Sequence, residues 1–233
     1  DAVLKLAATA PPLATAPWRP EDEIGETGTG SPVVAVAGGA AFTFGYAEQD
    51  ELLAAAGARI SVVDPLRDEK LPDDTALLLL PGGFPEQHAA ELSANAPLRR
   101  AIAGFAASGG VVHAECGGLL YLVRELDGLP MCGVLDATAA MSPTLTLGYR
   151  DAVATEDSVP HRAGQRVIGH EFHRTQVTPR AGGRPAWHWR GPAGEPVSEG
   201  FSTGRIHASY LHTHPAASPE TIGRLVAAAR EAR

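Results

Sequence analysis

A cysteine stands where the sequence predicts a sharp turn between a strand and a helix. The apolar, β-branched run that begins at Val111 stops at Cys116, and two glycines, Gly117 and Gly118, precede an apolar helical pattern. Such a turn lifts a nucleophile off a sheet and places backbone N–H groups beside it. A helix N-terminus also favours the thiolate. We therefore predict that Cys116 is a nucleophile; the alternative is a buried structural cysteine, the commoner fate of a lone cysteine.

A thiolate nucleophile needs a partner that moves protons, and the chain offers nine histidines. His212 is the best candidate because it follows the β-type run from Ile206 to Leu211 and precedes the strand-breaking Pro215. This position predicts His212 at the carboxyl end of a strand, on the same sheet edge as Cys116. A long sequence separation is normal for Cys/His pairs. On spacing alone, a surface histidine in a loop remains an equal alternative.

A second glycine turn, Gly82-Gly83, follows another predicted strand. The backbone N–H of Gly83 could pair with that of Gly117 to form an oxyanion hole. Negative charge develops on a carbonyl oxygen during acyl transfer, and losing one such donor costs roughly 3–4 kcal/mol. We assign Gly82, in the same turn, to substrate binding. The alternative for both glycines is an ordinary tight turn.

Arg150, which ends a Gly-Tyr-Arg motif, is a candidate clamp for a substrate carboxylate. A guanidinium grips a carboxylate through two N–H groups at once. Taken alone, such a residue is more often a surface arginine.

The histidine-rich stretch from Gly169 to His173 suggests a metal site at first sight. On a strand, however, Glu171 and His173 share one face and His170 lies on the other. The later histidines, His207 among them, also lack a cysteine or carboxylate at the usual zinc spacing. We therefore predict no metal ion in this chain.

Composition narrows the class of protein. The 233 residues fit one generous α/β domain, and a net charge of −8 argues against general nucleic-acid binding. No apolar run is long enough for a membrane span, and Cys116 and Cys132 make no disulfide framework, so we expect a cytoplasmic protein. Neither Lys5 nor Lys70 lies in a glycine loop, so the chain should not bind ATP through a phosphate loop.

The first 31 residues differ from the rest. They are rich in Pro, Ala and Gly, and the chain begins with Asp1 rather than Met. We predict that residues 1–31 are an interdomain linker that carries the last helical turn of a preceding domain, and that residues 32–233 form the catalytic domain. A loose N-terminal tail is the alternative.

From Ser31 onward, strand and helix patterns alternate, which is typical of an α/β fold with a largely parallel sheet covered on both faces. The second half adds strands of mixed direction. The predicted strands are 32–37, 59–63, 76–80, 111–114, 145–149, 166–172, 187–189 and 206–211, and the predicted helices are 46–56, 97–107, the segment after Cys116, and 218–233.

Five motifs, in this order, resemble the C-terminal glutamine amidotransferase domain of the cobyrinic (or hydrogenobyrinic) acid a,c-diamide synthase family. The resemblance runs from about residue 32 to the end of the chain. The motifs are PGGFPE (81–86), AECGGLLYL (114–122), LGYR (147–150), GHEFH (169–173) and ASYLHTH (208–214).

The resemblance implies a flavodoxin-like three-layer sandwich of the class I glutamine amidotransferases. In such a site Cys116 is the nucleophile, His212 the base, Gly83 and Gly117 the oxyanion donors, and Arg150 the group that holds the carboxylate of glutamine. It also implies an N-terminal synthetase domain, absent here, that uses ATP and Mg²⁺ to activate the a and c acetate side chains of a corrin. Ammonia from this domain would serve cobalamin biosynthesis.

One departure concerns the third member of the site. Many class I amidotransferases have a glutamate two residues after the histidine, but here that position is His214. We therefore expect a Cys-His dyad. The alternatives are a catalytically silent docking or channelling module, a cobyric acid synthase-type amidotransferase, and a different cysteine hydrolase. The sequence leaves open a homodimer, the order of the two amidations and whether the corrin carries cobalt.

Overall fold

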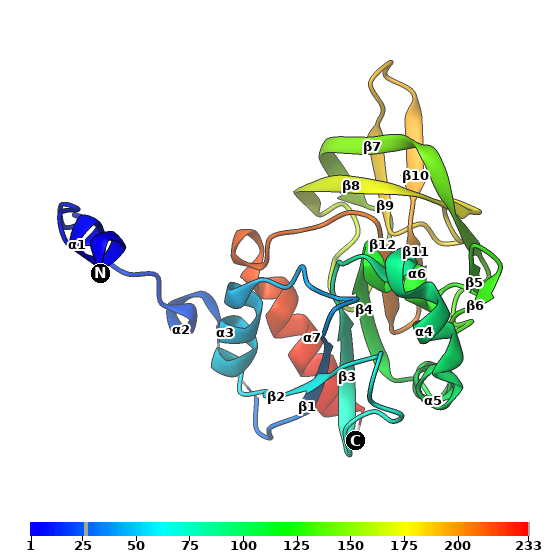
Figure 1. The fold of residues 1–233 in the computed structure, drawn as a ribbon, viewed down its shortest axis with the longest axis horizontal. Coiled ribbons are helices and arrows are strands. Elements are labelled where there is room, and N and C mark those ends of the chain that lie inside the picture. Colours follow the sequence, from blue (N-terminus) through cyan, green and yellow to red (C-terminus); the bar gives the residue numbers. More distant parts are fainter. Residues whose placement is uncertain (26–27, 233) are drawn as a thin grey trace.

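A mostly parallel sheet forms the centre of the protein in the computed structural model, which describes residues 1–25 and 28–232 (Figure 1). All neighbouring strands are parallel except the edge strand β11 (Phe201–Thr203), which is antiparallel to β12 (Ile206–Ser209). The predicted parallel α/β fold is therefore confirmed. The strand order is β11 (Phe201–Thr203), β12 (Ile206–Ser209), β4 (Val111–Glu115), β3 (Thr75–Leu80), β1 (Val33–Ala37) and β2 (Arg59–Val63).

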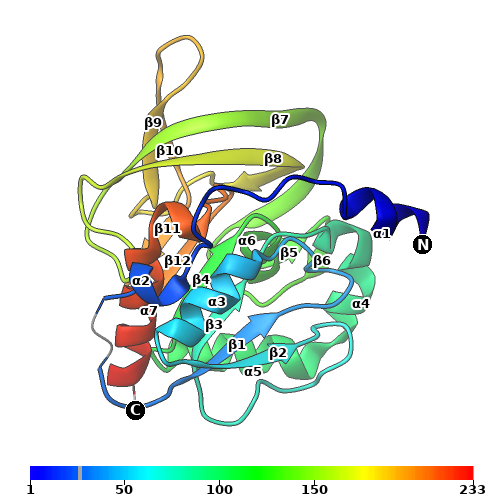
Figure 2. The ribbon, with the colours of Figure 1, turned by 90° about the vertical axis from the view of Figure 1, so that its left-hand side faces the viewer.

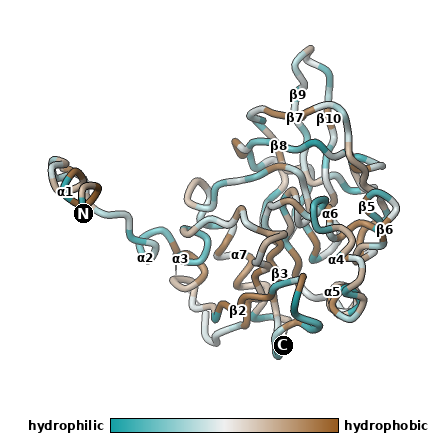
Figure 3. Tube along the Cα trace, in the orientation of Figure 1, coloured by the Kyte–Doolittle hydropathy of each residue, from teal (hydrophilic) through white to brown (hydrophobic). Residues whose placement is uncertain are grey.

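Helices cover both faces of this sheet, because side chains alternate along each buried strand. On β3, Leu77 and Leu79 pack into one core and Leu78 and Leu80 into the other. Hydrophobic residues accordingly concentrate on the central strands (Figure 3). The first core is closed by α3 (Ala47–Ala55) and α7 (Pro219–Glu231), and the second by α4 (Ala89–Ala94), α5 (Ala96–Ala107) and α6 (Gly117–Leu122).

A second sheet, of mixed strand direction, lies over the carboxyl ends of the central strands (Figures 1 and 2). Its main feature is a long antiparallel pair, β7 (Thr138–Ala154) and β8 (Arg166–Thr178), which the sequence predicted only in part. The predicted strand at 206–211 belongs to the central sheet, beside the strand that leads to Cys116, and ends at Ser209. The second sheet contains β5 (Glu125–Leu126), β6 (Leu129–Pro130), β7 (Thr138–Ala154), β8 (Arg166–Thr178), β9 (Trp187–Arg190) and β10 (Pro196–Glu199), and short 3₁₀ turns occur at Pro85–His88 and Pro215–Ala217.

The N-terminal segment makes two short helices, α1 (Ala2–Ala7) and α2 (Pro20–Glu23), and α1 has no buried residue. In Figure 1 α1 stands apart from the body of the protein. Its helical turn agrees with the expectation for this segment, whereas the linker role of residues 1–31 stays a prediction. Residues 26–27 of that linker, and Arg233 of the predicted last helix, lie outside the described residues.

Within residues 1–25 and 28–232, no helix is both long and apolar enough to cross a membrane.

Candidate active site

Cys116 occupies the turn between β4 and α6, as the sequence predicted. Its backbone has φ 47° and ψ −99°, a conformation that a residue with a Cβ adopts only when its surroundings enforce it. The amide N–H of Cys116 donates to the carbonyl oxygen of Ser209 at 2.7 Å, which ties the turn to the neighbouring strand β12. The side chain is almost fully buried. Strain of this kind in a packed turn marks a candidate nucleophile.

His212 lies three residues beyond β12, at the same sheet edge. Because β12 pairs in parallel with β4 and sets Ser209 opposite Glu115, the two strands end side by side. Two backbone hydrogen bonds to His170 of β8 then fix His212. The N–H of His212 donates to the carbonyl oxygen of His170 at 2.9 Å, and the carbonyl oxygen of His212 accepts from the N–H of His170 at 3.0 Å. The two imidazoles stack at 4.9 Å with 13° between their planes. The sheet edge therefore brings Cys116 and His212 together.

The charge state of His212 reflects these neighbours. Burial lowers its pKa, but hydrogen bonding to Cys116 and the charge of Glu115 outweigh burial and raise the pKa to about 10. The imidazolium is therefore the stable form at neutral pH. A protonated histidine beside a thiol favours the thiolate, the reactive form of cysteine.

The two glycine turns meet beside the cysteine. A Cβ atom on Gly117 would lie 2.8 Å from the amide nitrogen of Gly83, and one on Gly83 would lie 2.1 Å from the carbonyl oxygen of Ala41. The two turns can approach this closely because Gly117 has no Cβ, and the turn of Gly83 can lie against Ala41 because Gly83 has none. In the described part of the chain, the amide N–H groups of Gly83 and Gly117 have no backbone acceptor. Two neighbouring amide N–H groups without a backbone acceptor suit a developing oxyanion.

Gly82 lies directly against the imidazole of His212. A Cβ atom at this position would lie 2.5 Å from Cε1 of His212 and 3.3 Å from Cβ of Phe44. The carbonyl oxygen of Gly82 accepts from the amide N–H of Phe44 at 3.1 Å. Its substrate-binding role stays a prediction, but the contact explains why the turn needs a residue without a side chain here.

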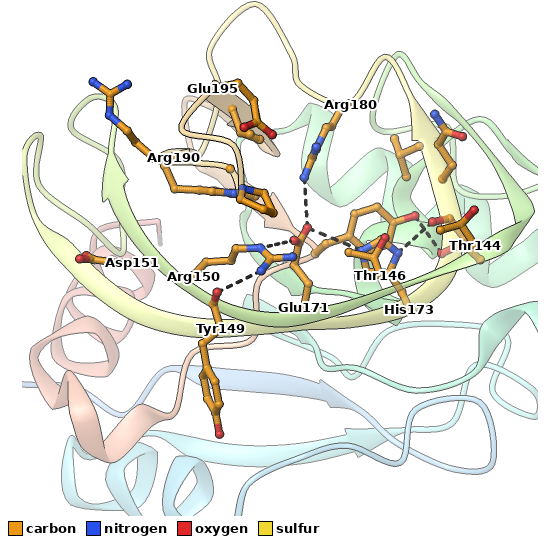
Figure 4. Close-up of a pocket in the computed structure, with 18 of the residues that line it drawn as sticks. Thr144, Thr146, Tyr149, Arg150, Asp151, Glu171, His173, Arg180, Arg190 and Glu195 are labelled. Carbon is orange, nitrogen blue, oxygen red and sulfur yellow. Dashed lines mark hydrogen bonds and ion pairs between the residues drawn. The ribbon is translucent and has the colours of Figure 1, made fainter.

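Arg150 lines a pocket that includes neither Cys116 nor His212. This pocket of about 700 Å³ lies on one face of β7 and β8, where Nε of Arg150 donates to Oε2 of the buried Glu171 at 2.7 Å (Figure 4). Glu171 also faces Arg180 at 3.4 Å and Nε2 of His173 at 3.6 Å. The pKa of Glu171 is lowered: burial raises it, and hydrogen bonds from His173 and Arg150 more than offset that effect. The clamp role of Arg150 stays a prediction.

Tyr210 connects this pocket to the cysteine. Its ring stacks on His173 with a centroid distance of 3.6 Å, and it lines the pocket with Arg150. The pKa of Tyr210 is raised, mainly by burial and in part by the charge of Cys116. A smaller pocket of about 290 Å³ lies on the opposite face of β8, lined by His212, His170, Phe172 and residues 43–46. Both pockets therefore adjoin the same sheet edge.

Glu115 is the residue near His212 that the sequence did not single out. Its Oε2 lies 3.7 Å from Nδ1 of His212, although it directly precedes Cys116 in the chain. The sequence does contain one signal: His113 lies on the predicted strand 111–114 and Glu115 directly follows that strand, so that the two residues share a face if the strand extends by one residue. The contact with His212 depends on the pairing of β4 with β12, which spacing does not reveal.

No group of three or more potential ligands in the described residues is arranged to hold a metal ion. His173 and Glu171 do face each other, as expected from strand alternation, but their other partners are Arg150, Arg180 and the carbonyl oxygen of Thr175.

Solved structures with a similar fold confirm the architecture. The chain aligns with PurLQS from Thermotoga maritima (TM-score 0.55, 16% identity, 86% of this chain and 98% of that one). It also aligns with a putative GMP synthase protein from Thermoplasma acidophilum (TM-score 0.57, 10% identity, 88% of this chain and 96% of that one). At these identities the likeness concerns the fold alone. The class of protein comes from the family model, which matches residues 33–220 and describes a glutamine amidotransferase domain.

The family model identifies the chain more specifically than the fold does. Residues 33–220 match the CobB/CobQ-like glutamine amidotransferase domain, and the chain belongs to this family. The predicted family is thereby confirmed.

Curated relatives agree with this assignment. The hydrogenobyrinate a,c-diamide synthase of Streptomyces coelicolor is 63% identical over 193 residues, which are 83% of this chain and 39% of that protein. The enzymes of the same name from Mycobacterium tuberculosis and Thermobifida fusca are 54% and 47% identical, over 91% and 97% of this chain. The chain spans half or less of the length of these relatives, 46% and 50% in the last two.

Proposed function

We propose that this chain hydrolyses glutamine through Cys116 and His212 and supplies the ammonia to a synthetase portion of a longer protein. The observation that carries the proposal is the strained Cys116 turn in contact with His212, beside the paired turns of Gly83 and Gly117. In this proposal, the nucleophile, the proton carrier and the oxyanion donors all come from one edge of the sheet. The family assignment makes glutamine the substrate that this set of groups serves.

The proposed chemistry starts from the imidazolium form of His212. The Cys116 thiolate attacks the γ-amide carbon of glutamine, and the N–H groups of Gly83 and Gly117 stabilise the negative oxygen. Imidazolium His212 gives its proton to the departing nitrogen, so that the C–N bond breaks and ammonia leaves. Neutral His212 then takes a proton from water as the water oxygen attacks the γ-glutamyl thioester. Glutamate leaves and Cys116 is regenerated.

We assign glutamine binding to Arg150, with Gly82 shaping the turn beside His212. Glutamine has a carboxylate that a guanidinium can hold. Tyr210 lines the same pocket as Arg150, and the charge of Cys116 contributes to the raised pKa of Tyr210. The existing pair with Glu171 restrains Arg150 in this pocket.

The destination of the ammonia is inferred from the relatives. Those at 47–63% identity are named hydrogenobyrinate a,c-diamide synthases, whereas those at 38–41% are named cobyrinate a,c-diamide synthases. We therefore propose amidation of the a and c side chains of hydrogenobyrinate, a step of cobalamin biosynthesis in the cytoplasm. ATP and Mg²⁺ would act in the synthetase portion, outside residues 1–233. The names of these relatives favour the diamide synthase over the cobyric acid synthase alternative.

Glutamate release from glutamine by the full-length protein tests the proposal. Cys116→Ser and His212→Asn should each lose at least about 100-fold in kcat, the usual contribution of a nucleophile or general acid–base group. Cys132→Ala is the matched control: burial raises the pKa of the Cys132 thiol and keeps it unreactive, so this variant should retain activity. A glutamine-mimicking diazoketone should label Cys116. Full activity of Cys116→Ser would reject the proposal, and an inactive wild type would favour the silent docking module.

A further inference from the structure

The carboxylate of Glu115 bridges two histidines from different positions in the fold. Its Oε2 lies 3.7 Å from Nδ1 of His212, and its Oε1 lies 3.7 Å from Nε2 of His113. His113 is two residues earlier on β4 and shares a face with Glu115, as strand alternation requires. His212 comes from the chain beyond the parallel neighbour β12. The carboxylate therefore lies between the strand that carries the cysteine and the segment that carries its proton partner.

Further hydrogen bonds hold this carboxylate in one orientation. Oε1 accepts from the backbone N–H of Thr213 at 3.2 Å and from its hydroxyl at 2.8 Å. Thr213 directly follows His212, so the same carboxylate fixes the backbone next to the imidazole. The Glu115 side chain is only 13% exposed. A buried carboxylate with several donors stays charged and well oriented.

The backbone at Cys116 explains how two consecutive residues reach one imidazole. Successive side chains on a regular strand point to opposite faces. The positive φ of Cys116 ends the strand immediately after Glu115, and the chain reverses into α6. Cys116 and Glu115 can therefore both contact His212. The thiol and the carboxylate would be unable to do this if β4 continued one residue further.

The residue two positions after His212 does not compete for this role. His214 is 46% exposed, its Nδ1 accepts from the backbone N–H of Ala216 at 3.3 Å, and its Nε2 lies 3.9 Å from Oε2 of Glu48. Its ring also packs on Tyr46, with a centroid distance of 4.7 Å. The polar partners of His214 are thus Glu48 and the backbone of Ala216, and not Glu115.

We propose that Glu115 is the positioning residue of His212, so that the site is a triad whose third member precedes the nucleophile in sequence. This inference rests on the proposed glutaminase function. A carboxylate opposite Nδ1 holds a proton on that nitrogen and leaves Nε2 to exchange a proton with Cys116. It also stabilises the imidazolium that protonates the departing ammonia. Glu115 touches neither substrate nor reacting atoms, and it acts through His212.

The expected signature is a change in the pH profile. Loss of the negative charge at Glu115 makes the imidazolium less stable, so the alkaline limb of kcat/KM should move to lower pH. The other titratable groups near this pair are not changed by the substitution. They are Cys116 and His170 beside His212, and His113, His161, His207 and Tyr46 around Glu115.

The test compares Glu115→Gln with wild type in glutamate release by the full-length protein, between about pH 6 and about pH 10. We expect a loss of at least about tenfold in kcat, little change in KM, and an alkaline limb shifted by about one pH unit. Glu115→Asp keeps the charge and should restore the limb even if kcat stays low. Thr213→Val, which removes only the 2.8 Å hydrogen bond, covers the case in which Glu115→Gln fails to fold. It should lower kcat less than Glu115→Gln, with unchanged KM.

Two matched variants separate the failure of this inference from failure of the function. Glu48→Gln removes the carboxylate that pairs with His214 and should leave kcat and the pH profile unchanged. Cys116→Ser tests the function itself. If Cys116→Ser is inactive while Glu115→Gln and Thr213→Val keep the wild-type kcat and alkaline limb, Glu115 is not a positioning residue. If Cys116→Ser is fully active, both proposals fail.

Discussion

Gly117 and Gly83 come so close that a Cβ atom on Gly117 would lie 2.8 Å from the amide nitrogen of Gly83. The two residues are 34 positions apart, one after β4 and one after β3. Both strands run parallel and end at the same edge, so their following turns meet beside Cys116. The contact ties the geometry of the candidate oxyanion hole to the pairing of two central strands.

The first prediction concerns this contact. Gly117→Ala should displace the amide of Gly83 and lower kcat about 100- to 1,000-fold, the usual effect of losing one oxyanion donor. Steady-state glutamate release measures the loss. Gly104→Ala is the control, because Gly104 lies in α5 with no atom within 4 Å of the added Cβ. It should keep activity and gain about 0.5–1 kcal/mol of stability. Equal activity of both variants would show that the Gly117–Gly83 contact does not matter for hydrolysis.

Gly82→Ala gives a second prediction, because its Cβ would lie 2.5 Å from Cε1 of His212. The imidazole must rotate or shift, and we expect kcat to fall at least about tenfold while the thermal unfolding midpoint changes little. Gly45→Ala, also near His212 but with open space at its Cβ, should behave as wild type. A Gly82→Ala variant with wild-type kcat would mean that His212 tolerates movement.

Sequence patterns predicted the central sheet and its edge well, because buried parallel strands are continuous apolar runs bounded by glycine turns. They placed Cys116, His212 and Gly83 at strand ends, and the structure brings these ends together. The patterns failed where the structure depends on pairing between distant strands. Only a third of β7 was predicted, since an exposed strand in a mixed sheet lacks a continuous apolar run.

Glu115 shows the same limit at the level of a single residue. On a strand, alternation predicts which neighbour shares its face, and this holds for His113. The contact with His212 requires that β12, 91 residues further on, pairs in parallel with β4. Nothing in the local spacing encodes that partner. The buried pair of Arg150 and Glu171 arises likewise, from the register of β7 on β8.

Arg150 supports a third prediction, which separates a substrate clamp from a structural cation. Arg150→Met leaves the buried Glu171 with Arg180 and His173 alone, so stability should fall by up to about 3 kcal/mol. The KM for glutamine should rise if the guanidinium holds the substrate carboxylate. In the double variant Arg150→Met/Glu171→Gln the unpaired charge is gone, and denaturant unfolding should show stability restored. A restored KM in that double variant would rule out the clamp.

Glu199 supplies a prediction about pH and stability. This carboxyl is fully buried, and its oxygens accept from the Ser209 hydroxyl at 2.6 Å and the Tyr210 N–H at 2.9 Å. Burial outweighs these hydrogen bonds and raises its pKa from 4.5 to about 7. Between these values the folded protein keeps the proton that the unfolded chain releases. The Glu199 contribution to stability is therefore largest below pH 4.5 and falls as the pH rises to 7.

Glu199→Gln should remove this dependence, because an amide has no proton to lose. Relative to wild type, the variant should gain a few kcal/mol in free energy of unfolding between about pH 5 and about pH 8, measured by urea denaturation at each pH. Comparing the two proteins at every pH subtracts the titration of all other groups. Asp136→Asn, which removes a carboxylate whose side chain is 90% exposed, is the matched control for the loss of one negative charge. Parallel stability curves for wild type and Glu199→Gln would show that Glu199 is already ionised at the acidic end of this range.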